Sequence, residues 1–266
     1  ADLVREADRA LDALRADGTL KRISENYFGA DVSVEDGGEA RVGGREEASW
    51  LTSVREAAWP AFVALVKITI PLTAISFAIG LAAAVLIALA RASSSRWLAW
   101  PARFFISAVR GTPLLLQLFV VFYGLPQVGL DLPSFPAAVL ALSVNVAGYG
   151  AETVRGALLA VPRGQHEAAA TIGMSDRLAL RRVVLPQAAR IAVPPLSNTL
   201  ISLVKDTSLV SVVLLTDVTR VLNQQASRVD YLPLYLLGGL YYWIVCTVLS
   251  VAQGRLETRL NRYVTP

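Results

Sequence analysis

The sequence predicts an all-α membrane protein. Of its 266 residues, 54% are hydrophobic and 17% are charged, which is too apolar for a disordered or low-complexity chain. Residues 61–90 contain one charged side chain, Lys67, in thirty positions. About 20 apolar residues are enough for a helix to cross the hydrocarbon core of a bilayer, so this run predicts a membrane-spanning helix. It follows a long polar segment and is too long for a signal peptide.

Four further apolar runs bring the expected number of transmembrane helices to five. They contain at most two charged side chains each and comprise residues 111–130, 132–151, 191–215 and 231–254. Pro194 and Pro195 are expected to interrupt the fourth span, because proline lacks a backbone N–H and its ring clashes with the preceding helical turn.

The basic side chains lie at the ends of these runs. Residues 1–58 have 13 acidic and 8 basic side chains, whereas residues 59–266 have 8 acidic and 17 basic ones. Because the basic residues flank apolar runs instead of lining one solvated face, they indicate membrane topology and argue against nucleic-acid binding. Cytoplasmic loops are rich in Lys and Arg, so we expect the N-terminus outside and the C-terminus in the cytoplasm. The eleven arginines assigned to the cytoplasmic side are Arg91, Arg96, Arg103, Arg163, Arg177, Arg181, Arg182, Arg190, Arg255, Arg259 and Arg262.

The chain divides into three parts by composition. Residues 1–30 predict two short helices separated by Gly18, and residues 31–58, rich in Gly and Glu at their start, indicate a linker. Residues 59–266 form the membrane domain. Two short helices cannot bury enough apolar surface to fold alone, so we expect residues 1–30 to be the tail of a larger domain.

The loop at residues 161–190 predicts a docking helix. Pro162 favours a helix start and Gly173 a helix end, and the alanine run between them gives a smooth face that a partner backbone can approach. Ser175 is expected to cap a second helix, and Pro186 to open the next span.

The residue composition does not favour a metal site or a catalytic site. With one cysteine, Cys246, and one histidine, His166, the chain can build neither an internal disulfide nor a Cys/His zinc cluster. No phosphate-binding loop of the type GxxxxGK[ST] is present. We therefore expect no catalytic residue, no metal site and no cofactor in this chain, and an intramembrane enzyme is disfavoured.

Several phrases of the membrane region resemble one known family. Glu167, Ala168 and Ala169 form an EAA signature, which is followed by Gly173 and by a Leu-Pro-Gln triplet at 185–187. The flanking phrases are RGTPLLLQLF from Arg110, AGYGAETVRG from Ala147, VPRGQHEAA from Val161 and LVKDTSLVSVV from Leu203. Over residues 66–254 they resemble the membrane subunits of bacterial ATP-binding-cassette importers for polar amino acids.

The resemblance implies a type I importer permease fold in the bacterial plasma membrane. It implies that the EAA segment is a coupling helix, which docks into a separate cytoplasmic ATPase subunit that holds ATP and Mg. The residues expected at this contact are Arg163, Gly164, Gln165, His166, Glu167, Ala168, Ala169 and Gly173.

Two further likenesses concern the substrate. The segment at residues 10–29 resembles the end of periplasmic amino-acid-binding proteins, which suggests that an extracytoplasmic binding domain is fused upstream. The phrase TIPLTAISFAIG at residues 69–80 resembles permeases for cystine and other polar amino acids.

Polar side chains within the spans mark the expected substrate pathway. A charge at membrane depth costs about 2.5 to 3.5 kcal/mol on insertion scales, so such groups pair with one another or face a polar cavity. The candidate pathway residues are Asn145, Tyr149, Glu152, Arg155, Ser197, Asn198, Ser202, Lys205, Asp206, Thr207 and Ser208. The sequence leaves open whether they contact an amino acid or only join neighbouring helices.

Five spans make a thin wall around a pathway, so we expect a dimer with a second copy or a close homologue. The alternative is a secondary transporter or channel that needs no ATPase. An internal inverted repeat would favour it, and five spans of unequal character show none.

Overall fold

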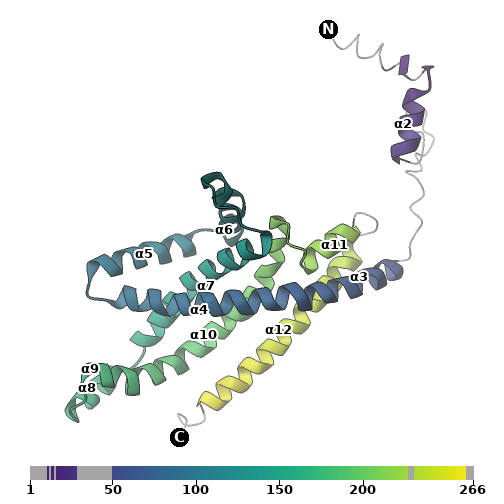
Figure 1. Ribbon diagram of the computed structural model, residues 1–266. Coiled ribbons are helices and arrows are strands. Elements are labelled where there is room, and N and C mark those ends of the chain that lie inside the picture. Colours follow the sequence, from purple (N-terminus) through teal and green to yellow (C-terminus); the bar gives the residue numbers. More distant parts are fainter. Residues whose placement is uncertain (1–10, 12, 15, 29–49, 227–230, 262–266) are drawn as a thin grey trace.

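A computed structural model describes residues 11, 13–14, 16–28, 50–226 and 231–261 (Figure 1). Within these ranges every regular element is a helix, and no strand occurs. Most of the expected linker and the first ten residues of the N-terminal segment lie outside the described residues. In chain order the elements are α2 (Thr19–Phe28), α3 (Trp50–Ala64), η1 (Leu65–Thr69), α4 (Ile70–Ala92), α5 (Arg96–Gly111), α6 (Leu114–Phe119), η2 (Val120–Gly124), η3 (Leu125–Val128), α7 (Ser134–Leu159), α8 (Arg163–Thr171), α9 (Asp176–Ala179), η4 (Leu180–Val184), α10 (Leu185–Asp206), η5 (Thr207–Val213), α11 (Val218–Ala226) and α12 (Tyr231–Asn261).

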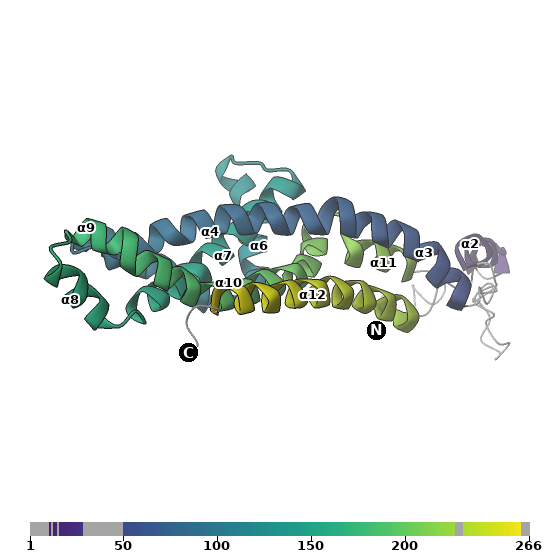
Figure 2. The ribbon, with the colours of Figure 1, turned by 90° about the horizontal axis from the view of Figure 1, so that it is seen from below.

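The long helices run side by side and make the membrane domain elongated (Figures 1 and 2). α8 and α9 lie at one end, α12 runs toward that end, and α3 and α11 lie at the opposite end. α6 projects sideways from the bundle.

Three helical stretches are long and apolar enough to cross a membrane: Leu51–Ala92, Ser134–Leu159 and Tyr231–Leu260. Two bent helix pairs, Arg96–Gly111 with Leu114–Val128 and Asp176–Val213 with Val218–Ala226, raise the number to five if each pair counts as one span. These segments overlap the five apolar runs of the sequence, and the predicted five spans are the upper end of this range.

The first span begins earlier than the sequence indicated. Residues 50–58, expected to belong to the linker, form the start of α3, so the linker prediction is wrong there. The reason is packing, because Ala57 and Ala61 are fully buried in a cluster with Val218 and Leu222 of α11.

The second span is not the straight helix expected over residues 111–130. The chain bends by 108° between α5 and α6, at Thr112 and Pro113. A residue that precedes proline avoids the helical region, and Thr112 is accordingly extended with φ −119° and ψ 142°. Arg96 and Arg103, expected in a cytoplasmic loop, instead lie within α5.

Three prolines sit just after π-helical turns inside long helices. η1 precedes Pro71, η2 precedes Pro126 and η4 precedes Pro186. In each case the N–H of the residue before the proline donates to the carbonyl five residues earlier, as Leu185 does to Leu180. The wider turn accommodates the proline, so the helix continues through Pro71 and Pro186, whereas after Pro126 it ends in the 3-10 turn η3. Pro186 lies in the first turn of α10, as expected, although the helical backbone runs into it from η4.

α10 is continuous through Pro194 and Pro195, so the expected interruption is wrong. The Thr199 hydroxyl adds a hydrogen bond to the Pro195 carbonyl at 3.0 Å. The irregular part of this span comes later, in the 3-10 turn η5 and at Leu214, whose φ is +63°.

α4 and α7 form the most extensive helix pair. α4 presents Ser76, Gly80, Ala84 and Ala88 at four-residue spacing, and all four are buried. A Cβ on Gly80 would lie 2.6 Å from the Cβ of Val146 on α7, so this glycine is needed for the close approach.

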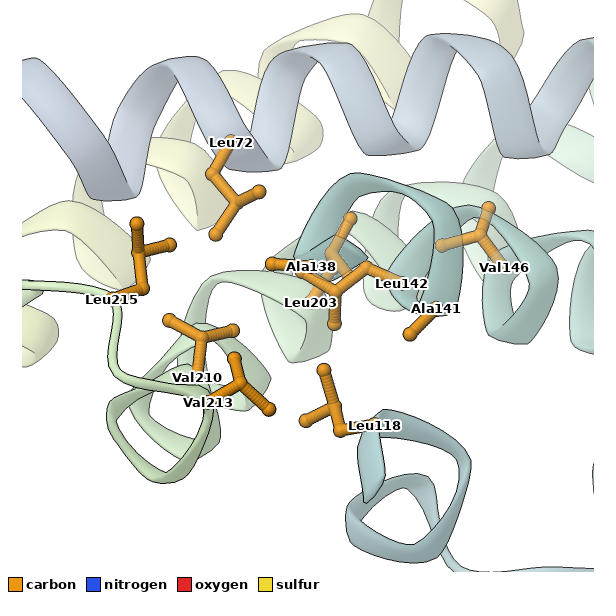
Figure 3. Packing of buried hydrophobic residues seen from close by; sticks show 10 residues of the cluster. All are labelled: Leu72, Leu118, Ala138, Ala141, Leu142, Val146, Leu203, Val210, Val213 and Leu215. Carbon is orange, nitrogen blue, oxygen red and sulfur yellow. The ribbon is translucent and has the colours of Figure 1, made fainter. Parts of the chain in front are cut away.

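The largest apolar cluster fills the middle of the membrane domain (Figure 3). Leu72 of α4 and Leu203 of α10 meet Leu142 of α7 there. Leu118 of α6 and Val210 of η5 complete the cluster, which thus holds the projecting α6 segment to the bundle. The core fixes the walls of the polar cavity described next.

Candidate coupling helix and translocation cavity

The EAA segment is an independent surface helix, α8, at one end of the molecule (Figure 1). Pro162 precedes its first residue, and it ends in a Schellman motif. The N–H of Met174 donates to the Ala169 carbonyl at 3.0 Å, and that of Gly173 donates to the Ala170 carbonyl at 2.9 Å. This motif needs a left-handed residue, and Gly173 has φ +78°.

All the predicted contact residues of α8 except one are exposed. Ala169 is buried, whereas the side chains or backbones of the remaining seven candidates, Arg163, Gly164, Gln165, His166, Glu167, Ala168 and Gly173, face outward. The smooth face therefore consists of Ala168 and Ala170, and Ala169 packs inward.

α8 is attached to the long helix that follows it. The Gln187 amide of α10 donates to Gln165 Oε1 at 3.0 Å. Val161, directly before α8, packs with Val184 and Ala188 in a small buried cluster. α8 and the residue that leads into it are thus in direct contact with η4 and α10. Ser175 occupies the N-cap of α9 as expected, but its side chain makes no capping hydrogen bond.

A polar cavity of about 460 Å³ lies between the α5–α6 bend, α7 and α10. Five of the predicted pathway residues line it: Asn145, Tyr149, Asn198, Ser202 and Asp206. The remaining lining residues include Thr112, Pro113, Leu114 and Thr199, which were not among the predicted pathway residues. The first three belong to the RGTPLLLQLF phrase, so its occurrence in the family resemblance was the available signal.

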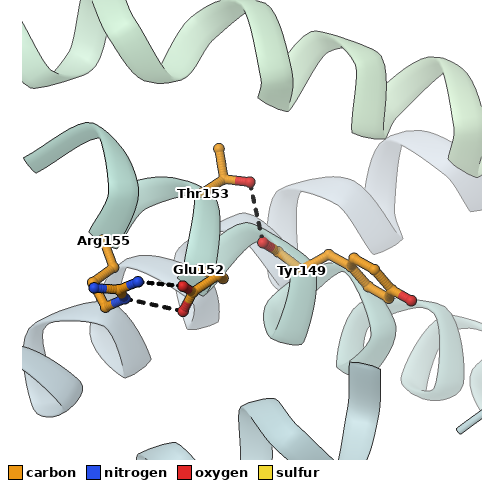
Figure 4. Close-up of polar contacts among 4 residues, drawn as sticks. All are labelled: Tyr149, Glu152, Thr153 and Arg155. Carbon is orange, nitrogen blue, oxygen red and sulfur yellow. Dashed lines mark hydrogen bonds and ion pairs between the residues drawn. The ribbon is translucent and has the colours of Figure 1, made fainter. Parts of the chain in front are cut away.

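Six of the predicted pathway residues do not line this cavity. Glu152 and Arg155 form a salt bridge on α7 (Figure 4). Thr207 is buried, and its hydroxyl donates to the Val204 carbonyl. Lys205 is exposed and, within the part of the chain that the structure describes, makes no salt bridge with Asp206. Ser197 and Ser208 are half-buried outside the cavity wall.

Two glutamines hold the cavity amides in place. Gln117 donates to the carbonyls of Val109 at 2.8 Å and Thr112 at 3.1 Å, which clamps the α5–α6 bend. Its own side-chain oxygen accepts from Asn145 Nδ2 at 3.1 Å. The Asn145 amide oxygen is therefore left to accept a hydrogen bond in the cavity.

Gln253 of α12 holds the second cavity amide, Asn198, in place. Its amide donates to Asn198 Oδ1 at 3.1 Å and to Glu257 Oε1 at 2.8 Å. Neither glutamine was predicted from the sequence, because their contacts with Asn145 and Asn198 join residues 28 and 55 positions apart in the chain.

The cavity suits a polar solute that carries a positive group. Its wall combines the Asp206 carboxylate with amide and hydroxyl groups, and none of the described residues that line it is basic. Ionisable groups at membrane depth mark substrate pathways when they face a polar cavity.

Residues 76–262 match the family described as binding-protein-dependent transport system inner membrane component. The chain belongs to this family. It is 46% identical over 213 residues to the L-cystine transport system permease protein TcyB of Bacillus subtilis, covering 79% of this chain and 91% of that protein. It is 37% identical over 196 residues to the arginine transport system permease protein ArtQ of the same organism, covering 73% and 90%.

Among solved structures, a crystal structure of an amino acid ABC transporter with histidines shares the fold. The TM-score is 0.74 at 34% identity, covering 79% of this chain and 98% of that one. The chain is thus a permease of an amino acid ABC importer, with a type I permease fold, and a multi-pass membrane protein instead of an enzyme.

Proposed function

We propose that this permease pairs with a second copy or a close homologue and forms the pathway by which a polar amino acid crosses the bacterial plasma membrane. ATPase subunits dock on α8, and a binding domain, fused upstream of residues 1–30, delivers the amino acid from outside. L-cystine is the first candidate substrate, since the chain is 46% identical to an L-cystine permease.

One observation supports the coupling role above all. α8 exposes the EAA segment and is attached to α10 through Gln165 and Gln187. α10 also provides Asn198, Ser202 and Asp206 to the cavity wall. Direct contacts through α10 thus link the proposed ATPase contact to the proposed substrate contact.

The mechanism that follows is a population shift between two arrangements of the dimer. ATP favours the arrangement in which the ATPase subunits close on α8, and the loaded binding domain favours the same arrangement. Hydrolysis then returns the cavity to the cytoplasmic side.

The test is the ATPase activity of this permease, assembled with its ATPase subunits and the full binding domain in lipid nanodiscs. L-cystine and the twenty proteinogenic amino acids are screened singly. We expect one or a few polar amino acids to stimulate hydrolysis. A rate that no amino acid changes contradicts the proposal.

Two substitutions at Gly173 separate coupling from folding. A Cβ there meets no atom within 4 Å, so only the backbone conformation is at stake. Gly173→Val strains the left-handed conformation and should abolish the stimulation of ATP hydrolysis. Gly173→Asn tolerates this conformation and should retain most of the stimulation. Both variants should insert into the membrane equally. Full stimulation of Gly173→Val would refute the role of α8.

A further inference from the structure

A second cavity adjoins the first at Tyr149. It has a volume of about 550 Å³ and lies between the end of α4, the second half of α5 and α7. Tyr149 lines both cavities. The guanidinium of Arg110, which lines the second cavity, lies 5.7 Å from the centroid of the Tyr149 ring.

The second cavity is strongly basic. Arg91, Arg103 and Arg110 line it, together with one acid, Glu152. Glu152 is already engaged by Arg155, with Nε donating to Oε2 at 3.0 Å (Figure 4). Among the described residues, none forms a salt bridge with the three lining arginines.

Arg103 and Arg110 are exposed and Arg91 is half-buried, so the three guanidinium groups are accessible to an anionic group. The first cavity has the opposite character, with Asp206 and, among its described lining residues, no basic side chain. Arg91 is near the end of α4, on the side of the molecule where α8 lies (Figure 1). The basic cavity therefore lies between the Asp206 cavity and the proposed ATPase end.

We propose that the three arginines form a carboxylate-binding station, which receives the transported amino acid after it has passed Tyr149. This inference rests on the proposed function. In the Asp206 cavity the ammonium group of the amino acid is the group that is recognised. Beyond Tyr149, the carboxylate exchanges water for the guanidinium groups of Arg103 and Arg91, and Arg110 takes part beside Tyr149.

The same chemistry would suit the phosphate of an anionic lipid. Tyr149 lines both cavities, and Arg110 of the second cavity lies against its ring, so a polar solute in the first cavity is adjacent to the arginines; this proximity favours the amino acid. The experiment distinguishes these sources.

The test measures equilibrium binding to the nucleotide-free complex in nanodiscs. The probes are the amino acid that stimulates the ATPase of the unmodified complex, and the amine that remains when its carboxylate is removed, which for L-cystine is cystamine. We expect Arg103→Gln and Arg91→Gln to weaken binding of the amino acid by about tenfold each, since a charge-assisted hydrogen bond is lost. Binding of the amine should change by less than about twofold, because only the carboxylate contact is removed.

Arg96→Gln is the matched control. Arg96 lies one heptad before Arg103 on α5, is exposed and does not line the cavity, so amino acid binding should not change. Arg103→Lys should restore part of the lost affinity.

Three results would overturn the station. Equal losses for the amino acid and the amine would indicate a general structural effect. Unchanged amino acid binding, together with loss of co-purified phosphatidylglycerol from Arg103→Gln, would assign the arginines to lipid. If the unmodified complex binds no amino acid at all, the proposed function fails as well, a result distinct from the other two.

Discussion

At the scale of single residues, Asp217 shows how a charge becomes part of the fold. Its side chain is fully buried, yet Oδ2 accepts from the Thr219 N–H and Oδ1 from the Arg220 N–H, both at 3.0 Å. The Tyr242 hydroxyl of α12 donates to Oδ2 at 3.4 Å. Asp217 thus caps α11 and joins it to α12, and a buried carboxylate is tolerated because its hydrogen bonds are satisfied.

Asp217→Ala should destabilise the protein by about 1–2 kcal/mol, since it removes the cap of α11 and leaves buried donors without an acceptor. Asp217→Asn retains one acceptor oxygen, so its loss of stability should be smaller. Thermal unfolding in detergent measures this, with a thiol-reactive dye that reports the exposure of the half-buried Cys246. Equal stability of the alanine variant and the unmodified protein would show that the cap is not needed.

At the scale of elements, the spacing of small residues decides which helices lie closest. Ser76, Gly80, Ala84 and Ala88 form a buried stripe on α4, and α7 packs against it. In a bilayer the hydrophobic effect does not drive helices together, because lipid tails are as apolar as the side chains. Stripes of small residues instead allow close van der Waals packing between helices. The walls of both cavities depend on this contact, because α7 provides Asn145, Tyr149 and Glu152.

Gly80→Ala should therefore destabilise the protein. The new methyl group would lie 2.6 Å from Val146 Cβ and 2.8 Å from the Ser143 backbone oxygen, so the two helices must separate. Overpacking of this kind costs typically 1–3 kcal/mol. Gly156→Ala is the control on α7, because a Cβ there meets nothing within 4 Å. The thiol-dye assay compares the melting temperatures of the Gly80→Ala and Gly156→Ala variants. Equal melting temperatures would mean that α4 and α7 accommodate the methyl group without loss of stability.

At the scale of the whole molecule, local signals in the sequence found the apolar runs and α8. The helix of the EAA segment was predictable because Pro162 and Gly173 act within one turn of its ends. The bend at Thr112 also has a local signal, because Pro113 follows it. It was not predicted, because both residues lie within an uncharged run that was interpreted as one span.

Other features have no local signal. The left-handed backbone at Leu214 depends on how η5 and α11 pack, and leucine gives no indication of it. Asn198 and Gln253 are 55 residues apart in sequence, so their hydrogen bond follows from the arrangement of α10 and α12. The basic cavity likewise combines residues of three helices, none of which is informative alone.

The arrangement of the helices also makes the predicted membrane orientation testable. α8 and the end of α12 lie at one end of the molecule, with most of the arginines assigned to the cytoplasm, and α3 lies at the other (Figure 1). In a Cys246→Ala background, we introduce His166→Cys on α8 and Thr52→Cys on α3, both exposed positions. A membrane-impermeant maleimide should label Thr52→Cys in right-side-out vesicles and His166→Cys in inverted ones. Labelling of His166→Cys from outside would reverse the orientation and remove α8 from the reach of a cytoplasmic ATPase.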